Sequence, residues 1–359
     1  MIIIIERVMI ANRPVLPIIH DMMIEIKEHE PLAPHTIYKI GGTARFFASV
    51  KNRAELEEAL KFATDHGAPF FIMGAGSNTL VSDKGFDGMV IRMAGGEIKI
   101  DGEPSNTTLA VAEGDKNEVA KVDILGERMT ADAGVMMARA AAEAARAGLA
   151  GFAWAIGVPG TIGGSVRGNA GCFGNEMKDV VESVDVFDAI KATSYKIQAT
   201  SCQFAYRDSI FKRHSEWVVV SATLKLGKGD SAIIQQEIRA MSMERAAKQD
   251  IGAKSCGCIF KNPAWLDVFE AKEKLLAQFP ELAVFAERPE IPAAFLIDRA
   301  GLKGKRTGHI IISDKHANFF VNEGGGTAGE ARSLIASAKS AVQEKYGIVL
   351  QEEIQYLGF

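Results

Sequence analysis

The sequence predicts an α+β fold, in which strands, a helix and further strands follow one another without the alternation of repeating βαβ units. Two observations support this prediction. Apolar runs typical of strands occur in groups that amphipathic helices separate. Two glycine-rich segments each follow a short apolar run, so the chain turns sharply where those strands end. At 359 residues the chain is too long for one small core, and two or three domains are expected.

The first predicted helix covers residues 53–66 and ends at Gly67. Its apolar residues recur on one face, as an amphipathic helix requires: Leu56, Ala59, Leu60 and Ala63. Residues 70–73 are predicted to form the next strand, and residues 89–91 another. A hairpin-like stretch then runs through residues 110–112.

An alanine-rich helix is predicted over residues 135–147, with Gly148 as its stop. Strands are expected at residues 181–187 and 217–226, and a helix at residues 231–248. Glycine and charge at residues 227–230 mark a candidate domain boundary.

Near the end of the chain, Thr327 and Glu330 have the spacing of a capping box, which predicts a helix that begins there. Gly347 would stop this helix, and short strands are expected at residues 348–350 and 354–357. The buried stripe of the helix is predicted to consist of Leu334, Ile335, Ala338, Ala341 and Val342.

Composition excludes several classes of partner. The net charge is −4 and no basic stripe suited to nucleic acid is present. The apolar opening at residues 1–5 is interrupted by Glu6 and Arg7 and is far shorter than the ~20 residues of a membrane span. We interpret it as a strand or a packing arm, and expect a soluble, cytoplasmic protein without a membrane partner. The four cysteines form neither a zinc pattern nor a C-x-x-C motif, so free thiols and no metal are expected.

The two glycine-rich segments, residues 74–78 and 157–171, are the candidate ligand site, because glycine lets backbone N–H groups approach an anion closely. Either segment alone is typical of a tight turn; together they favour a cradle for a large diphosphate ligand. Thr79 stands where a Rossmann fingerprint needs its third glycine, and no P-loop occurs, which leaves a non-Rossmann dinucleotide cradle. The candidate cofactor residues are Gly74, Ala75, Gly76, Ser77, Asn78, Gly157, Pro159, Gly160, Thr161, Gly163, Gly164, Asn169, Ala170 and Gly171.

A few polar side chains have the chemistry of catalysis. Arg207 suits a carboxylate or a developing oxyanion, although an isolated Tyr-Arg-Asp is more typical of a surface salt bridge. Cys258 could be a nucleophile, a proton donor or a packed hydrophobe, and the last is the commonest role. Strand alternation would turn one of Glu352 and Glu353 inward. His309 and His316, with Asn318 and Asn322, are interpreted as satisfied structural polar groups rather than metal ligands.

The order of these segments is more specific than any one of them. The chain carries His-Thr-Ile-Tyr-Lys-Ile-Gly-Gly-Thr-Ala at 35–44, both glycine segments, and Phe-Ala-Tyr-Arg-Asp-Ser at 204–209. The Gly257–Pro263 turn, Leu-Ile-Asp at 296–298 with Gly-Leu-Lys-Gly at 301–304, His-Ala-Asn-Phe at 316–319 and Glu353 follow. From about His35 to its end, the sequence strongly resembles the UDP-N-acetylenolpyruvoylglucosamine reductase (MurB) family.

The resemblance implies a two-lobed FAD-binding domain of the vanillyl-alcohol-oxidase (PCMH) type at residues 35–228, with the lobe boundary near residue 92. An extension, residues 1–34, would precede it, and a smaller α+β substrate domain, residues 229–359, would follow and return its last strand to the FAD domain. Neither glycine segment contains histidine, so FAD is expected to be non-covalent. Residues 225–253 lack a tyrosine-bearing insertion, as in the second type of the family.

The resemblance also implies an activity: NADPH-dependent reduction, through FAD, of a UDP-sugar enolpyruvyl ether to UDP-N-acetylmuramate, a cytoplasmic step of peptidoglycan synthesis. We expect the protein to be a monomer, although the sequence itself does not give the oligomeric state. Hydride would reach the β-carbon of the enolpyruvyl group, and the α-carbon would then be protonated. Arg207 and Glu353 match the positions that stabilise the intermediate, and Cys258 stands where the family usually has its serine proton donor. The matching substrate-binding residues are Tyr206, Lys261, Asn262 and His316.

The sequence departs from the family pattern at Cys258, at Arg167 and at residues 152–155. A thiol, with a reference pKa of about 8.5, remains mostly protonated at neutral pH and can still donate a proton. Two alternatives stay open: a flavin oxidase that uses oxygen as electron acceptor, and a non-catalytic paralogue that binds FAD or a UDP-sugar. Retention of Arg207 and Glu353 favours the reductase.

Overall fold

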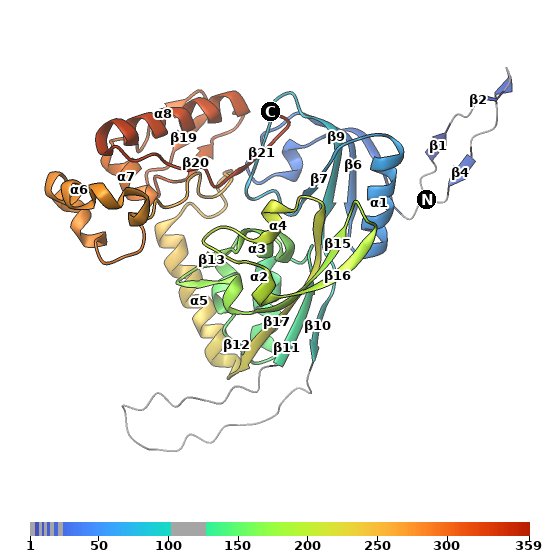
Figure 1. Ribbon diagram of the computed structural model, residues 1–359, viewed down its shortest axis with the longest axis horizontal. Helices are drawn as coiled ribbons and strands as arrows, with labels where there is room; N and C mark the ends of the chain where they lie inside the picture. Colours follow the sequence, from blue (N-terminus) through green and yellow to red (C-terminus); the bar gives the residue numbers. More distant parts are fainter. Residues whose placement is uncertain (1–3, 7–8, 11–12, 15–17, 21–23, 102–126) are drawn as a thin grey trace, which may run out of the picture. The chain divides into compact units, whose positions relative to one another are not determined.

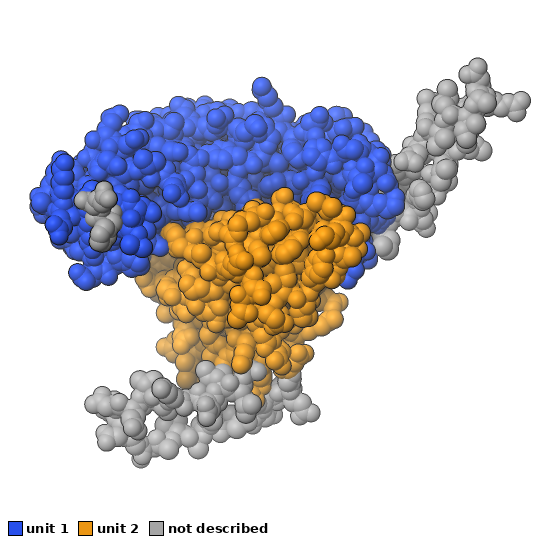
Figure 2. Space-filling model, viewed as in Figure 1, with its two compact units in different colours: residues 1–94, 246–359 blue, residues 95–245 orange. Residues whose placement is uncertain are grey.

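A computed structural model describes residues 4–6, 9–10, 13–14, 18–20, 24–101 and 127–359. The chain divides into two compact units: residues 1–94 with 246–359, and residues 95–245 (Figure 2). The first unit is therefore built from both ends of the sequence, whereas the second is one continuous stretch. The functional division expected from the sequence, at residues 35–228 and 229–359, is a different kind of boundary and stays a prediction.

The first unit contains a four-stranded sheet in the order β5-β6-β9-β7. Strands β6, β9 and β7 are parallel, and β5 runs antiparallel to β6 at the edge. Helix α1 (Arg53–Asp65) connects β6 to β7 and buries the apolar face that the sequence predicts. The strands are β5 (Lys27–Pro31), β6 (Thr43–Val50), β7 (Phe70–Met73) and β9 (Phe86–Met93).

A second, parallel pairing in this unit joins distant parts of the chain. Strand β8 (Thr79–Val81) lies beside β21 (Gln355–Leu357), with Thr79 opposite Gln355. The segments that lead into the two strands therefore lie at the same end of the pair. This end holds the first glycine segment on one side and Glu353 on the other.

The C-terminal part of the first unit packs helices against a small antiparallel sheet around a shared apolar core (Figure 1). Helix α8 (Ala328–Tyr346) has the predicted capping box of Thr327 and Glu330 and ends at Gly347, whose φ is 69°. Asp83 adds two hydrogen bonds, because its carboxylate accepts from the Ala328 and Gly329 N–H groups. The other elements are α6 (Lys272–Gln278), α7 (Ala293–Arg299), β18 (Arg306–Thr307), β19 (Ile310–Ile312) and β20 (Phe320–Asn322).

The second unit is built on an antiparallel sheet in the order β10-β11-β17-β15-β16, with β12 also paired to β17. Its strands are β10 (Ile98–Asp101), β11 (Glu127–Asp132), β12 (Leu149–Ala150), β15 (Val181–Asp188), β16 (Thr193–Gln198) and β17 (Trp217–Lys228). Its helices are α2 (Met137–Arg146), α3 (Ile162–Gly168), α4 (Ile210–Arg213) and most of α5 (Ser231–Lys248), whose residues 246–248 belong to the first unit. Two two-residue strands form a hairpin, β13 (Gly171–Cys172) and β14 (Asn175–Glu176).

The predicted α+β class is confirmed, and the helices predicted at residues 53–66, 135–147 and 231–248 are present with bounds within two residues. The strand expected at residues 348–350 is wrong. Ile348 and Leu350 are buried in the core without strand pairing, so their apolar pattern reflects packing alone. Residues 110–112 lie outside the described residues.

Within the apolar opening of the chain, β1 (Ile4–Glu6) is a strand, and it pairs with β4 (Ile18–His20). Between them lies a second pair, β2 (Met9–Ile10) and β3 (Arg13–Pro14). Among the described residues no helix is long and apolar enough to cross a bilayer. All four cysteines are described and are free thiols, as predicted. Within the same ranges no cluster of His, Cys, Asp and Glu could hold a metal ion.

Candidate functional site

The first glycine segment, residues 74–78, forms the loop between β7 and β8. Gly76 has a φ of +62°, and a Cβ there would lie 2.6 Å from the His35 carbonyl oxygen, so glycine is required by the backbone itself. Within the described part of the chain, the N–H groups of residues 75–78 donate no hydrogen bond to protein. Because the loop is largely half-buried, these donors suit an anionic or strongly polar ligand.

The loop is fixed to the segment that carries Glu353. The Asn78 side-chain amide donates to the Glu353 carbonyl at 3.2 Å, and the Gln355 N–H donates to the Asn78 carbonyl at 2.9 Å. On the other side, Gly257 lies against the loop, since a Cβ on it would be 3.7 Å from the Ser77 carbonyl oxygen. The first candidate cofactor loop, the cysteine turn and Glu353 are thus in contact.

Cys258 lies half-buried in a turn that a buried asparagine holds. The Asn318 side chain accepts from the Phe260 N–H at 2.9 Å and donates to the Phe260 carbonyl at 2.8 Å. Cys258 itself forms a backbone bridge with Phe319, and the Glu353 N–H donates to the Ile259 carbonyl at 2.8 Å. Asn318 is therefore the satisfied structural polar group that the sequence predicts, and it orients the segment beside Cys258.

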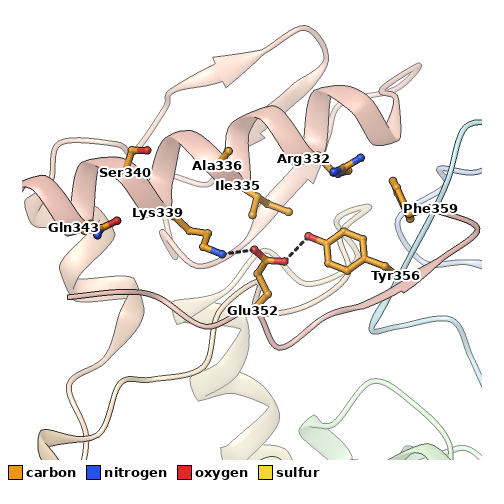
Figure 3. A pocket seen from close by; sticks show the side chains of 9 residues that line it. All are labelled: Arg332, Ile335, Ala336, Lys339, Ser340, Gln343, Glu352, Tyr356 and Phe359. Atoms are coloured by element: carbon orange, nitrogen blue, oxygen red, sulfur yellow. Dashed lines mark hydrogen bonds and ion pairs between the residues drawn. The ribbon is translucent and has the colours of Figure 1, made fainter. Parts of the chain in front are cut away.

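The two neighbouring acids have different surroundings. The Glu352 carboxylate accepts from Lys339 Nζ at 2.8 Å and from the Tyr356 hydroxyl at 2.7 Å, and all three line a pocket along α8 of about 660 Å³ (Figure 3). Although burial opposes ionisation, these hydrogen bonds and the lysine charge lower the pKa of Glu352. Glu352 is therefore committed to an ion pair, whereas Glu353 belongs to the segment beside Asn78.

The three predicted substrate residues of this unit have distinct roles in the structure. Lys261 is half-buried, and its backbone N–H donates to the Gln351 carbonyl. This bond places Lys261 beside the segment that carries Glu353. His316 packs edge-on against Phe319, the residue that bridges Cys258. The Asn262 side chain accepts from the Ala293 N–H at the start of α7 and donates to Glu290, so it holds the fold together locally.

The second glycine segment leads from a 3-10 helix, η2 (Ala153–Gly157), into α3. Pro159 and Gly160 lie between the two helices, and Thr161 caps α3 by accepting from the Gly164 N–H at 3.5 Å. A Cβ on Gly163 would lie 2.8 Å from the Ala133 methyl, so packing explains this glycine. Gly164 is exposed, and a Cβ on it would make only an ordinary contact with Thr161 Oγ1 at 3.7 Å, so it is the most accessible glycine of the helix start.

The residues after α3 contact the turn that carries Tyr206 and Arg207. Asn169 ends α3 with a φ of 42°, and its side-chain amide donates to the Ala205 carbonyl at 2.9 Å. The Arg207 guanidinium donates to the Gly171 carbonyl at 3.4 Å and stacks over the Tyr206 ring at 5.2 Å. Ala170 instead accepts from the Met177 N–H at 2.9 Å, outside this turn.

Arg167, a departure from the family pattern, lies on α3 near this turn, and burial lowers the pKa of its guanidinium while Asp208 opposes that shift. Sequence reasoning missed Ser209, which is fully buried and donates to the Arg167 carbonyl at 2.7 Å. Its place directly after Tyr-Arg-Asp was visible in the sequence, but a single serine gives no signal of burial.

The first glycine loop fits FAD, because it holds backbone donors that protein groups do not use, and the second unit presents a further glycine segment at the start of α3. A family profile described as an FAD-binding domain matches residues 44–190. The chain is thus an FAD flavoprotein, and no Rossmann helix follows its first glycine loop, as predicted.

The particular family follows from the rest of the chain. A profile described as the C-terminal domain of UDP-N-acetylenolpyruvoylglucosamine reductase matches residues 249–357. The reductase of that name from Solibacter usitatus is 33% identical over 328 residues, 91% of this chain and 95% of the relative. The reductase from Caldicellulosiruptor bescii is 34% identical over 337 residues, 93% and 91% of the two chains. The chain belongs to the UDP-N-acetylenolpyruvoylglucosamine reductase family.

A solved structure agrees with this assignment. The crystal structure of the reductase MurB from Thermus caldophilus superposes with a TM-score of 0.65 at 29% identity, over 94% of this chain and 99% of that one. The predicted fold, an FAD-binding domain followed by the family's C-terminal domain, is thereby confirmed. The protein is an FAD-dependent oxidoreductase of this family.

Proposed function

We propose that the protein reduces UDP-N-acetylenolpyruvoylglucosamine to UDP-N-acetylmuramate with electrons from NADPH, a cytoplasmic step of peptidoglycan synthesis. The observation that carries this proposal is the contact between three segments of the first unit. The loop of Ser77 and Asn78, the turn of Cys258 and the segment of Glu353 touch one another through backbone contacts. A monomer with non-covalent FAD is sufficient for this chemistry.

The loops at residues 74–78 and 157–171 would hold FAD through backbone N–H groups. FAD, when bound, supplies the hydride for the enolpyruvyl β-carbon. The enolpyruvyl carboxylate then gains negative charge as its α-carbon becomes a carbanion, and Arg207 is the cation of the second unit assigned to it. Tyr206 and Lys261 would orient the sugar nucleotide with His316, whereas Asn262 would act through the start of α7.

Glu353 and Cys258 have the two remaining roles, stabilisation of the carboxylate and protonation of the α-carbon. Glu353 acts on the same carboxylate as a protonated acid or through a hydrogen bond, because two adjacent anions would repel. The Cys258 thiol donates its proton to the α-carbon, and its half-burial keeps the group within reach of substrate. General-acid catalysis of this kind contributes about 10²–10⁴-fold in rate.

Anaerobic stopped-flow absorbance of the flavin tests the proposal. NADPH is added first, to follow the reductive half-reaction, and UDP-N-acetylenolpyruvoylglucosamine second, to follow the oxidative half-reaction. We expect rapid reoxidation without oxygen and formation of UDP-N-acetylmuramate. A flavin that stays reduced until air is admitted would identify an oxidase, and one that neither NADPH nor NADH reduces would leave a non-catalytic binding protein. Repeating the first step with NADH measures the preference between the two nicotinamides.

A further inference from the structure

Asn169 is the residue at which α3 meets the turn that carries Arg207. It has no exposed surface and adopts a left-handed backbone conformation, with φ at 42°, which a non-glycine residue adopts at a cost. Its side-chain amide donates to the Ala205 carbonyl and to Glu176 Oε2, both at 2.9 Å, and its side-chain oxygen accepts from the Lys178 N–H at 3.0 Å. Both amide protons are therefore committed to the protein.

The turn that Asn169 holds is short and strained. Ala205 and Asp208 exchange backbone hydrogen bonds of 3.0 and 3.1 Å, which places Tyr206 and Arg207 at its tip. Arg207 has a φ of 53°, again left-handed, and Lys212 Nζ donates to its carbonyl at 2.5 Å. A left-handed residue other than glycine persists only where its surroundings impose the conformation.

Both ends of the turn are fastened to the end of α3. Asn169 holds Ala205 at the start of the turn, and Ser209 holds the end through the Arg167 carbonyl. Gly164, the accessible glycine that would meet the cofactor, lies at the opposite end of the same seven-residue helix. The candidate cofactor segment and the arginine turn are thus one connected piece of the second unit.

We propose that Asn169 is a positioning residue for Arg207, which it holds at a fixed place relative to the glycine end of α3 through its bond to Ala205. This inference rests on the proposed function. It gives the Asn169 side chain a role other than donating to the cofactor, because both of its amide protons are used within the protein. A displacement of about 1 Å at a substrate-positioning group costs up to about 100-fold in rate.

Two substitutions separate positioning from folding. Asn169→Asp turns a carboxylate toward Glu176 Oε2 and the Ala205 carbonyl, so it breaks both bonds. Adding Glu176→Gln lets the new amide donate to Asp at position 169, which restores that link while the Ala205 carbonyl still faces an acceptor; the exchange also removes the half-exposed ion pair of Glu176 with Lys178. Asn175→Ala is the matched control, because it removes an exposed amide that donates to the Phe173 carbonyl within the nearby hairpin.

The experiment follows both half-reactions of the holoenzyme, together with FAD affinity from fluorescence titration and the melting temperature. For N169D/E176Q we expect the FAD affinity and the rate of reduction by NADPH to stay within about threefold of wild type. The melting temperature should stay within a few degrees of wild type. We expect reoxidation by UDP-N-acetylenolpyruvoylglucosamine to be about 10- to 100-fold slower. In an Arg207→Ala background, the same pair of changes should slow reoxidation by no more than a further factor of about two. N175A should match wild type throughout.

Three results would overturn the inference: wild-type reoxidation in N169D/E176Q, an equal slowing of both half-reactions, or a full additional loss in the Arg207→Ala background. Weakened FAD binding alone would return Asn169 to the cofactor site. If instead the wild-type protein is not reoxidised by the substrate, the proposed function fails, and that failure is visible before any variant is compared.

Discussion

The side-chain amide of Asn78 donates a hydrogen bond to the main-chain carbonyl of Glu353, 275 residues further along the chain, at 3.2 Å. One residue belongs to the predicted cofactor loop and the other carries the predicted catalytic carboxylate. This bond, together with the one from the Gln355 N–H to the Asn78 carbonyl, fastens the loop to the segment that carries the acid.

Asn78→Ala removes this bond without altering either backbone segment. We expect a loss of about 1 kcal/mol in the free energy of unfolding, typical of one hydrogen bond. We also expect weaker FAD binding and reoxidation by substrate slowed about 10-fold. Urea melts, flavin titration and stopped-flow measure the three quantities. Asn175→Ala is again the control; an Asn78→Ala protein with wild-type values in all three would show that the bond has no role.

Cys258→Ala and Cys258→Ser test the proton donor as a pair. The alanine variant should be reoxidised by substrate about 10²–10⁴-fold more slowly, because general-acid catalysis is lost, while reduction by NADPH is unchanged. The serine variant keeps a hydroxyl and should recover most of the rate. The activity of the serine variant should also resist inactivation by iodoacetamide, whereas the activity of Cys172→Ser should remain sensitive to it. If alanine reoxidises like wild type, Cys258 is a packing residue only.

Glycine is required at one position of the cofactor loops and dispensable at another. In Gly76→Ala the new methyl would meet the His35 carbonyl at 2.6 Å in a left-handed conformation, so we expect a loss of about 2–4 kcal/mol of stability and of FAD binding. Gly168→Ala, at the end of α3, would meet nothing within 4 Å and should be neutral or slightly stabilising. Equal melting temperatures for the two variants would contradict the packing described here.

Stability should fall at alkaline pH. Burial raises the pKa of the Cys202 thiol from 9.0 to about 11, and raises that of Cys256 as well. The folded state thus keeps protons that the unfolded state loses, so this contribution is complete below pH 9 and disappears as pH rises through the folded pKa. Each thiol contributes a slope of about 1.4 kcal/mol per pH unit.

In Cys202→Ala, the number of protons released on unfolding between pH 9 and pH 11 should fall by about one. The slope of the unfolding free energy against pH, from urea melts at several pH values, measures this number. From pH 6 to pH 8 the curves of wild type and variant should run parallel, offset only by the lost packing of the buried sulfur. An unchanged alkaline slope in the variant would mean that the thiol is not responsible.

Sequence periodicity predicted the elements whose boundaries have local chemical causes. The capping box of Thr327 with Glu330 and the left-handed Gly347 fix both ends of α8, and both signals lie within a few residues of where they act. Residues 348–350 misled, because Ile348 and Leu350 are buried on either side of the exposed Val349, and core packing of this kind produces the same alternation as strand pairing. Periodicity cannot distinguish the two.

The site residues also divide into those with a signal in the sequence and those that only the folded chain reveals. Cysteine, arginine and glutamate at 258, 207 and 353 could be singled out by their chemistry and by resemblance to a family. Asn318 and Ser209, which hold the turns of Cys258 and Arg207, gave no such signal, because their partners are backbone atoms 58 and 42 residues away. Only the folded chain reveals which amide or hydroxyl meets which carbonyl.

The parallel pair of β8 and β21 imposes an order on biosynthesis. Residues 79–81 leave the ribosome on the order of tens of seconds before residues 355–357, at ordinary rates of translation. Throughout that interval β8 lacks its partner strand and Asn78 lacks the carbonyl of residue 353. The continuous stretch of residues 95–245 is by then already synthesised and free to fold. The β8–β21 pair, and with it the bond from Asn78 to residue 353, can therefore form only after synthesis of the chain is almost complete.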